Sequence, residues 1–131
     1  MNENDSTGGD AGTEIDLASG IAAFESRNFS QALRLLGPLA EAGDGDAQYR
    51  LAIMYQNGLG VVRSEETAAR WMRSAAFQGM ALAEHGLGCM YLDGDCVRRD
   101  SAQAAVWLAR AAAQGLEGSK LLLDMIRENG A

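Results

Sequence analysis

A repeat of 36 residues constrains this chain more strongly than any other feature of its sequence. When the sequence is shifted by 36 positions, 14 of the 33 residues from Ala47 to Gly79 coincide with an identical residue. Composition alone would give about three or four such coincidences in a chain rich in alanine. The identical pairs include Trp71 with Trp107, Tyr55 with Tyr91, and Gln78 with Gln114. A repeat of this length predicts a stack of similar units, each of which contacts only its neighbours.

Weaker traces of the same period extend to both sides of these two units. Upstream, Ala32 lies 36 positions before Ala68, and downstream Leu123 lies 36 positions after Leu87. Divergent end units are expected in a stack, because they cover faces that would otherwise meet water. We therefore expect one repeat domain at 14–131, with units at about 14–43, 44–79 and 80–115 and a half-unit at 116–129.

Each unit is predicted to consist of two helices. In the first helix of the second unit, Ala47 and Leu51 begin an apolar stripe at helical spacing. Asp44 or Asp46 can cap the start of this helix, and the glycines of the segment 58–61 end it. The second helix follows its own capping residue, which is Ser64 in this unit and Asp100 in the next.

The large residues that repeat are expected to form the core of the stack. Alanines at matching positions let the helices approach closely, and the tryptophans fill the space between neighbouring pairs. A ligand cage made of the same aromatic residues is the alternative, but residues at helical spacing are more typical of a core. The expected core residues are Leu51, Tyr55, Trp71, Leu87, Tyr91 and Trp107. The predicted fold is all-α: a right-handed α/α solenoid of about three helix-turn-helix pairs with a C-terminal capping helix.

This pattern resembles the Sel-1-like repeat family, relatives of the tetratricopeptide repeat, with the consensus A-x3-LG-x2-Y-x2-G-x-GV-x2-D-x3-A-x2-W-x3-AA-x2-G. The second unit matches it at Ala47, Leu51, Tyr55, Gly58, Gly60, Val61, Ala68, Trp71, Ala75, Ala76 and Gly79. The third unit matches it at Ala83, Leu87, Gly88, Tyr91, Gly94, Val97, Asp100, Ala104, Trp107, Ala111, Ala112 and Gly115. The resemblance implies a scaffold for protein–protein interaction, and the family has no common catalytic residues.

Three positions depart from what this pattern requires. Ser64 replaces the usual aspartate, which exchanges one capping residue for another. Cys96 replaces the second loop glycine, so the loop is expected to be strained if its backbone has a positive φ there. Pro38 lies inside the second helix of the first unit, where it removes a helical hydrogen bond and predicts a kink.

The resemblance also implies that the first helix of each pair lines a concave inner face. The inward positions are Leu17, Ile21, Phe24, Tyr49, Ile53, Gln56, His85, Cys89, Leu92, Leu121 and Met125. Arg50 and Glu84 are expected to anchor polar groups at the rim. An apolar groove of this kind is typical of a surface that binds a peptide or a partner protein. The alternative is that adjacent helices or the N-terminal arm cover these side chains.

The acidic charge of the chain limits its partners. The formal net charge is −7, which disfavours binding to nucleic acid and to anionic membranes. Residues 1–16 contain five acids and no base, and we expect a disordered acidic arm at 1–13. The N-terminal sequence lacks the basic start and apolar stretch of a secretory signal, so we expect a cytoplasmic protein.

Chemistry at the cysteines is the alternative to a scaffold. His85 and Cys89 lie four residues apart and could form a thiolate–imidazole pair of a Cys/His-dependent hydrolase, like the β-lactamase-linked, cysteine-rich members of the family. We expect no enzyme, no cofactor and no metal site, because the pair has no further partner in the sequence. Cys89 and Cys96 are expected to be reduced, although a turn near Gly94 would allow a disulfide. We expect a monomer, and a homodimer through the end faces is the other possibility.

Overall fold

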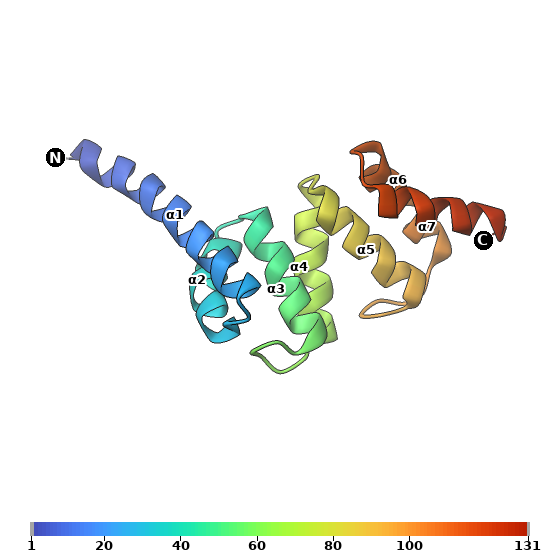
Figure 1. Cartoon of the computed structure of the whole chain (residues 1–131), viewed down its shortest axis with the longest axis horizontal. Helices are drawn as coiled ribbons and strands as arrows, with labels where there is room; N and C mark the ends of the chain where they lie inside the picture. The colour runs from blue at the N-terminus through green and yellow to red at the C-terminus, as the bar shows by residue number, and fades with distance from the viewer. Residues whose placement is uncertain (1, 131) are drawn as a thin grey trace.

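The computed structural model describes the backbone of residues 2–130 and the side chains of residues 14–130. Within this part of the chain there are seven α-helices and no strands. The helices are α1 (Asn2–Glu25), α2 (Phe29–Glu41), α3 (Gly45–Asn57), α4 (Glu65–Phe77), α5 (Ala81–Asp93), α6 (Ser101–Ala113) and α7 (Glu117–Glu128). Each helix packs on the next one in the sequence, so the pairs follow one another along the long axis of the molecule (Figure 1). The fold is the predicted α/α solenoid of helix pairs with a final single helix.

The helix ends form where the capping residues predict them. Asp44, not Asp46, caps α3, and its carboxylate accepts a hydrogen bond from the backbone N–H of Ala47 at 2.8 Å. Ser64 and Asp100 cap α4 and α6 in the same way. The glycines that end α3 and α5 have φ angles of 66° and 70°, a left-handed conformation that glycine adopts without strain.

Helix α1 begins at Asn2, so its backbone includes residues 2–13 of the predicted acidic arm. The disorder of that arm stays a prediction. This part of the helix projects from the stack (Figure 1). A helix satisfies its backbone hydrogen bonds locally, so it can extend past the last residue that packs on a neighbour.

The repeated apolar residues form the core, as the sequence predicts. Leu51, Leu87, Trp71 and Trp107 are all buried. Tyr55 and Tyr91 are only half-buried and pack against the edge of the core. Alanines on both helices of the pairs are fully buried, at Ala47, Ala68, Ala75, Ala83, Ala104 and Ala111. These small side chains allow the close helix approach that the composition suggested.

Cys96 and Pro38, two of the positions that depart from the repeat pattern, have different outcomes in the structure. Cys96 has a φ angle of 70°, so it adopts the left-handed conformation of its repeat counterpart Gly60, whose φ is 71°. The condition for strain at Cys96 is therefore met. Helix α2 runs through Pro38 without ending, and the kink at that residue stays a prediction.

A hydrogen-bonded clamp holds the two helices of a pair together and repeats with the 36-residue period. The side-chain amide of Gln78 donates to the backbone carbonyl of Gly43 at 3.0 Å and to the side chain of Gln48 at 2.9 Å. Gln114 makes the equivalent pair of contacts one unit later. The clamp holds the end of the second helix of a pair to the first helix of the same pair, 30 residues earlier, and to the loop that precedes that first helix.

Candidate functional site

Helices α1 and α3 contact each other, as do helices α5 and α7, and we call the surface formed by these four odd-numbered helices the odd-helix face. The Arg50 guanidinium of α3 lies 5.9 Å from the centre of the Phe24 ring of α1. Between α5 and α7, Nδ1 of His85 lies 2.7 Å from Oγ of Ser119. The 36-residue period places Tyr49, His85 and Leu121 in one row across this face, and Ile53, Cys89 and Met125 in the next. These helices are the ones predicted to line the concave surface.

The exposure of apolar side chains on the odd-helix face rises toward the C-terminus. Leu17, Phe24, Tyr49 and Ile53 are half-buried and pack against the main core, and Ile21 is also half-buried. By contrast, Leu121 and Met125 on α7 are 64% and 55% exposed. The C-terminal end of the face therefore offers the larger apolar surface to a partner.

Leu82 is a member of this surface that the sequence analysis missed. Its side chain is 44% exposed and, with His85, Leu116, Gly118 and Ser119, lines a hollow of about 160 Å³ between α5 and α7. The repeat gave no signal for it, because Asp46 and Gly118 occupy the same position in the flanking units. Neither residue is apolar, so the position does not read as part of an apolar stripe.

A second hollow of about 170 Å³ lies beside the exposed end of α7. Its lining includes Leu92, Leu122, Met125 and Ile126. Leu92 was predicted as an inward residue of the groove, and its side chain is half-buried beside this hollow. The two hollows are depressions at the C-terminal end of the odd-helix face that side chains of a partner can enter.

Three predicted polar residues make polar contacts within the protein. Glu84 does not lie at a rim, because only 4% of it is exposed and its carboxylate accepts a hydrogen bond from Gln114 at 2.8 Å. Its buried position follows from the clamp, where it is the counterpart of Gln48. The Gln56 amide donates to the carboxylate of Asp95 at 2.9 Å. Arg50 is paired with Asp46 of its own helix at 3.0 Å.

A row of polar side chains crosses from α7 to α5 through His85. Besides its contact with Ser119, His85 places Nε2 3.4 Å from the Cys89 sulfur. Ser119 is fully buried, so its hydroxyl is closed to a substrate. Burial, and then the charge of Asp93, raise the pKa of the Cys89 thiol, which favours the neutral thiol over the nucleophilic thiolate. The predicted Cys/His pair exists as a contact, but its environment does not activate the sulfur.

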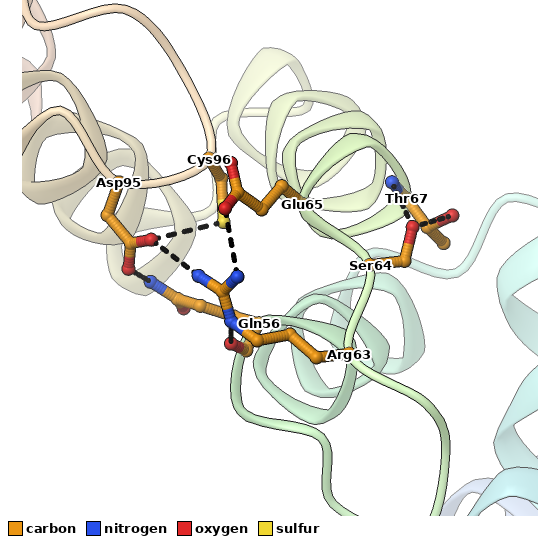
Figure 2. A network of polar contacts seen from close by, with 7 residues as sticks. All are labelled: Gln56, Arg63, Ser64, Glu65, Thr67, Asp95 and Cys96. Carbon is orange, nitrogen blue, oxygen red and sulfur yellow. Dashed lines mark hydrogen bonds and ion pairs between the residues drawn. The ribbon is translucent and has the colours of Figure 1, made fainter.

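The loops between the two helices of neighbouring units are tied together by a charged network, shown in Figure 2. Arg63 lies between two carboxylates, with nitrogens 2.9 Å from Glu65 and 2.9 Å from Asp95. Its Nε also donates to the backbone carbonyl of Gln56 at 2.8 Å. The repeat counterpart Arg99 donates to the carbonyl of Leu92 in the same way. The arginine is therefore a structural part of the repeat.

Both cysteines are free thiols. Burial and the carboxylate of Asp95 raise the pKa of Cys96 to about 11. Over the residues whose side chains are described, no group of three His, Cys, Asp or Glu side chains could hold a metal ion. In the same part of the chain, none of the helices combines the length and apolar character that a membrane crossing requires.

Comparison with known proteins agrees with the repeat. The family model for the Sel1 repeat matches three consecutive segments, at residues 19–44, 45–80 and 81–116. A search of curated proteins gave no significant match.

Two solved structures resemble this fold closely. One is the crystal structure of a Sel1 repeat protein from Oxalobacter formigenes, with a TM-score of 0.81 and 27% sequence identity over 86% of this chain. The other is c5321, a protective antigen of uropathogenic Escherichia coli strains with an SLR fold, with a TM-score of 0.85 and 30% identity over 90% of this chain. The aligned region spans 46% and 26% of those two proteins, respectively.

Proposed function

The chain belongs to the family of Sel1 repeat proteins, and on that premise we propose that it is a non-catalytic scaffold that binds a partner protein or peptide on the odd-helix face. Sel1 repeats generally mediate protein interactions. In a solenoid, the helices that line one face present side chains at regular intervals to an extended or helical ligand. A cytoplasmic location and a monomeric state stay predictions.

The observation that carries this proposal is the apolar surface at the C-terminal end of the odd-helix face. Leu82, Leu121 and Met125 are large apolar side chains that remain exposed. Leu82 lines a hollow of about 160 Å³, and Met125 lines one of about 170 Å³. Large exposed apolar surfaces are unfavourable in water, and on a folded domain they commonly mark a binding site.

The polar contacts of the same face support binding rather than catalysis. A hydrolase of the Cys/His type requires a thiolate that a substrate can reach. Burial raises the pKa of Cys89, and the serine that contacts His85 is fully buried. These groups are suited to holding α5 and α7 together.

Paired substitutions test the proposed surface. The double variant Leu121→Ala/Met125→Ala removes apolar area from exposed positions and is expected to keep the fold, because neither side chain belongs to the core. We expect this variant to lose the partners that the unmodified chain retains from a cell lysate. The matched control is Val106→Ala, which truncates an apolar side chain that is 47% exposed on α6. Equal retention by all three proteins would contradict the proposal.

A further inference from the structure

A cavity in the described part of the chain lies away from the exposed residues of the odd-helix face. It has a volume of about 610 Å³ and opens between α4 and the loop that joins α5 to α6. One wall is a single face of α4, where Glu66, Ala69 and Arg73 follow one another at helical spacing. The other wall carries Tyr91 and Arg98. The cavity is therefore lined by charges of both signs around a small, buried alanine floor.

Three charged side chains of this cavity, Glu66, Arg73 and Arg98, are not used in ion pairs within the described part of the fold. The Arg73 guanidinium has one polar contact there, 3.5 Å from the hydroxyl of Tyr91. The neighbouring Glu65 is in contrast paired with Arg63.

Comparison between units of the same chain shows that stacking does not need these charges. None of these charges recurs in the neighbouring units. In the preceding unit, the equivalent positions hold Ser30, Gly37 and Val62. In the following unit, the positions equivalent to Glu66 and Arg73 hold Ala102 and Ala109. The helices α2, α4 and α6 nevertheless have the same length and register. A feature that every unit shares serves the stack, whereas side chains found in one unit are available for binding.

At the unit-one counterpart of the cavity, an apolar side chain packs against the loop. Phe29 occupies the position of Glu65, and its Cβ lies 2.5 Å from where a side chain on Gly60 would begin. In the second unit, Glu65 replaces this phenylalanine and Ala69 replaces Leu33. Because a charged residue and a small residue replace two large apolar ones, space remains between the second and third pairs, and polar groups line that space.

We propose that this cavity binds a short peptide segment of a partner protein that carries one basic and one acidic side chain. Glu66 receives the base, while Arg73 and Arg98, with the Tyr91 hydroxyl, receive the carboxylate. Glu66 and Arg73 are seven residues apart, so they are separated by about 10 Å along the helix axis. Glu65 and Asp100 also line the cavity. Their charges disfavour a dianionic phosphate relative to a single carboxylate.

This site is independent of the proposed function of the odd-helix face, because it uses none of that surface's exposed apolar residues. It can be tested with the blocked peptide acetyl-Lys-Ala-Ala-Ala-Glu-amide and the uncharged control acetyl-Gln-Ala-Ala-Ala-Gln-amide. We expect the charged peptide to shift backbone amide NMR signals of residues 65–73 and 91–100, with a dissociation constant in the range of about 1 to 10 mM. The control peptide is expected to leave these signals in place.

Three variants identify the groups responsible. Glu66→Gln and Arg73→Gln are each expected to weaken binding by about tenfold, the typical effect of losing one charge-assisted hydrogen bond. Lys120→Gln removes an exposed charge on α7 and is expected to leave binding unchanged. The proposal is overturned if the charged peptide causes no shifts, if the shifts survive both cavity substitutions, or if a phosphoserine peptide of the same length binds more tightly. Unaltered spectra of the free variants confirm that the fold is intact.

Discussion

Gln114 donates a hydrogen bond from its side-chain amide to the carboxylate of Glu84, 2.8 Å away, and so joins α6 to α5 at the foot of the third unit. The same amide donates to the backbone carbonyl of Gly79. The contact repeats 36 residues earlier between Gln78 and Gln48, where the acceptor is a neutral amide oxygen. The two clamps thus differ in one respect, the charge of the buried acceptor.

Loss of the charged clamp is expected to destabilise the protein more than loss of the neutral one. Gln114→Ala leaves the carboxylate of Glu84 buried without its donor and should lower the free energy of unfolding by about 2–3 kcal/mol. Gln78→Ala should cost about 1 kcal/mol. Urea denaturation measures both. Adding Glu84→Gln to the Gln114→Ala background should recover part of the loss, and a larger effect at Gln78 than at Gln114 would contradict this account.

Trp71 is expected to be a major contributor to the stability of the stack. It is 7% exposed, and its replacement by alanine should cost about 3–5 kcal/mol because it leaves a cavity between helices. That amount is comparable to the total stability of many small domains. Circular dichroism during thermal unfolding should therefore show a variant that is largely unfolded at 37 °C. Trp71→Phe serves as the milder control, and a fully folded alanine variant would show that Trp71 is not a core residue.

The left-handed backbone at Cys96 predicts a stabilising substitution. Cys96→Gly should raise the free energy of unfolding by about 1 kcal/mol, because glycine adopts a φ of 70° without steric cost. At the counterpart position, Gly60→Ala should destabilise, since its new Cβ would lie 2.5 Å from Cβ of Phe29. Chemical denaturation of the two variants distinguishes the cases. Destabilisation by Cys96→Gly would mean that the cysteine's packing outweighs its strain.

The thiol of Cys96 is expected to react slowly at neutral pH. Its pKa is raised to about 11 from an ordinary value of 9.0, first by burial and then by Asp95. In a Cys89→Ser background, alkylation by iodoacetamide should therefore rise through about pH 11. Because the folded pKa lies above the unfolded one, the neutral thiol contributes stability below pH 9 that is lost as the pH rises toward 11. A rate that reaches its midpoint near pH 9 would contradict the burial of this thiol.

The fold was largely predictable because its determinants are local and periodic. The alignment of Trp71 with Trp107 fixes the period, and cap residues such as Ser64 and Asp100 fix the helix starts. The helical backbone of residues 2–13 was not predictable in this way, because that segment has no repeat counterpart and contains Gly8 and Gly9, which are poor helix formers.

The candidate site was less predictable, because burial depends on contacts between helices that are distant in the sequence. Position in the repeat assigned Glu84 to the odd-helix face, but the distant Gln114 decides that its carboxylate is buried. Leu82 was missed because Asp46 and Gly118, its counterparts, give the position no apolar pattern. The large cavity at Arg73 lies on helices that the repeat marks as structural, so only their packing reveals the space between them.

Site-directed photo-crosslinking tests the scaffold function most directly. A benzophenone amino acid placed at Leu121 would lie on the odd-helix face, and the same amino acid at Val106 would lie on α6; both positions are exposed and apolar in the unmodified chain. On irradiation in cells, we expect a discrete crosslinked partner from position 121 and none from position 106. The same partner crosslinked equally from both positions, or from position 106 alone, would contradict binding on the odd-helix face.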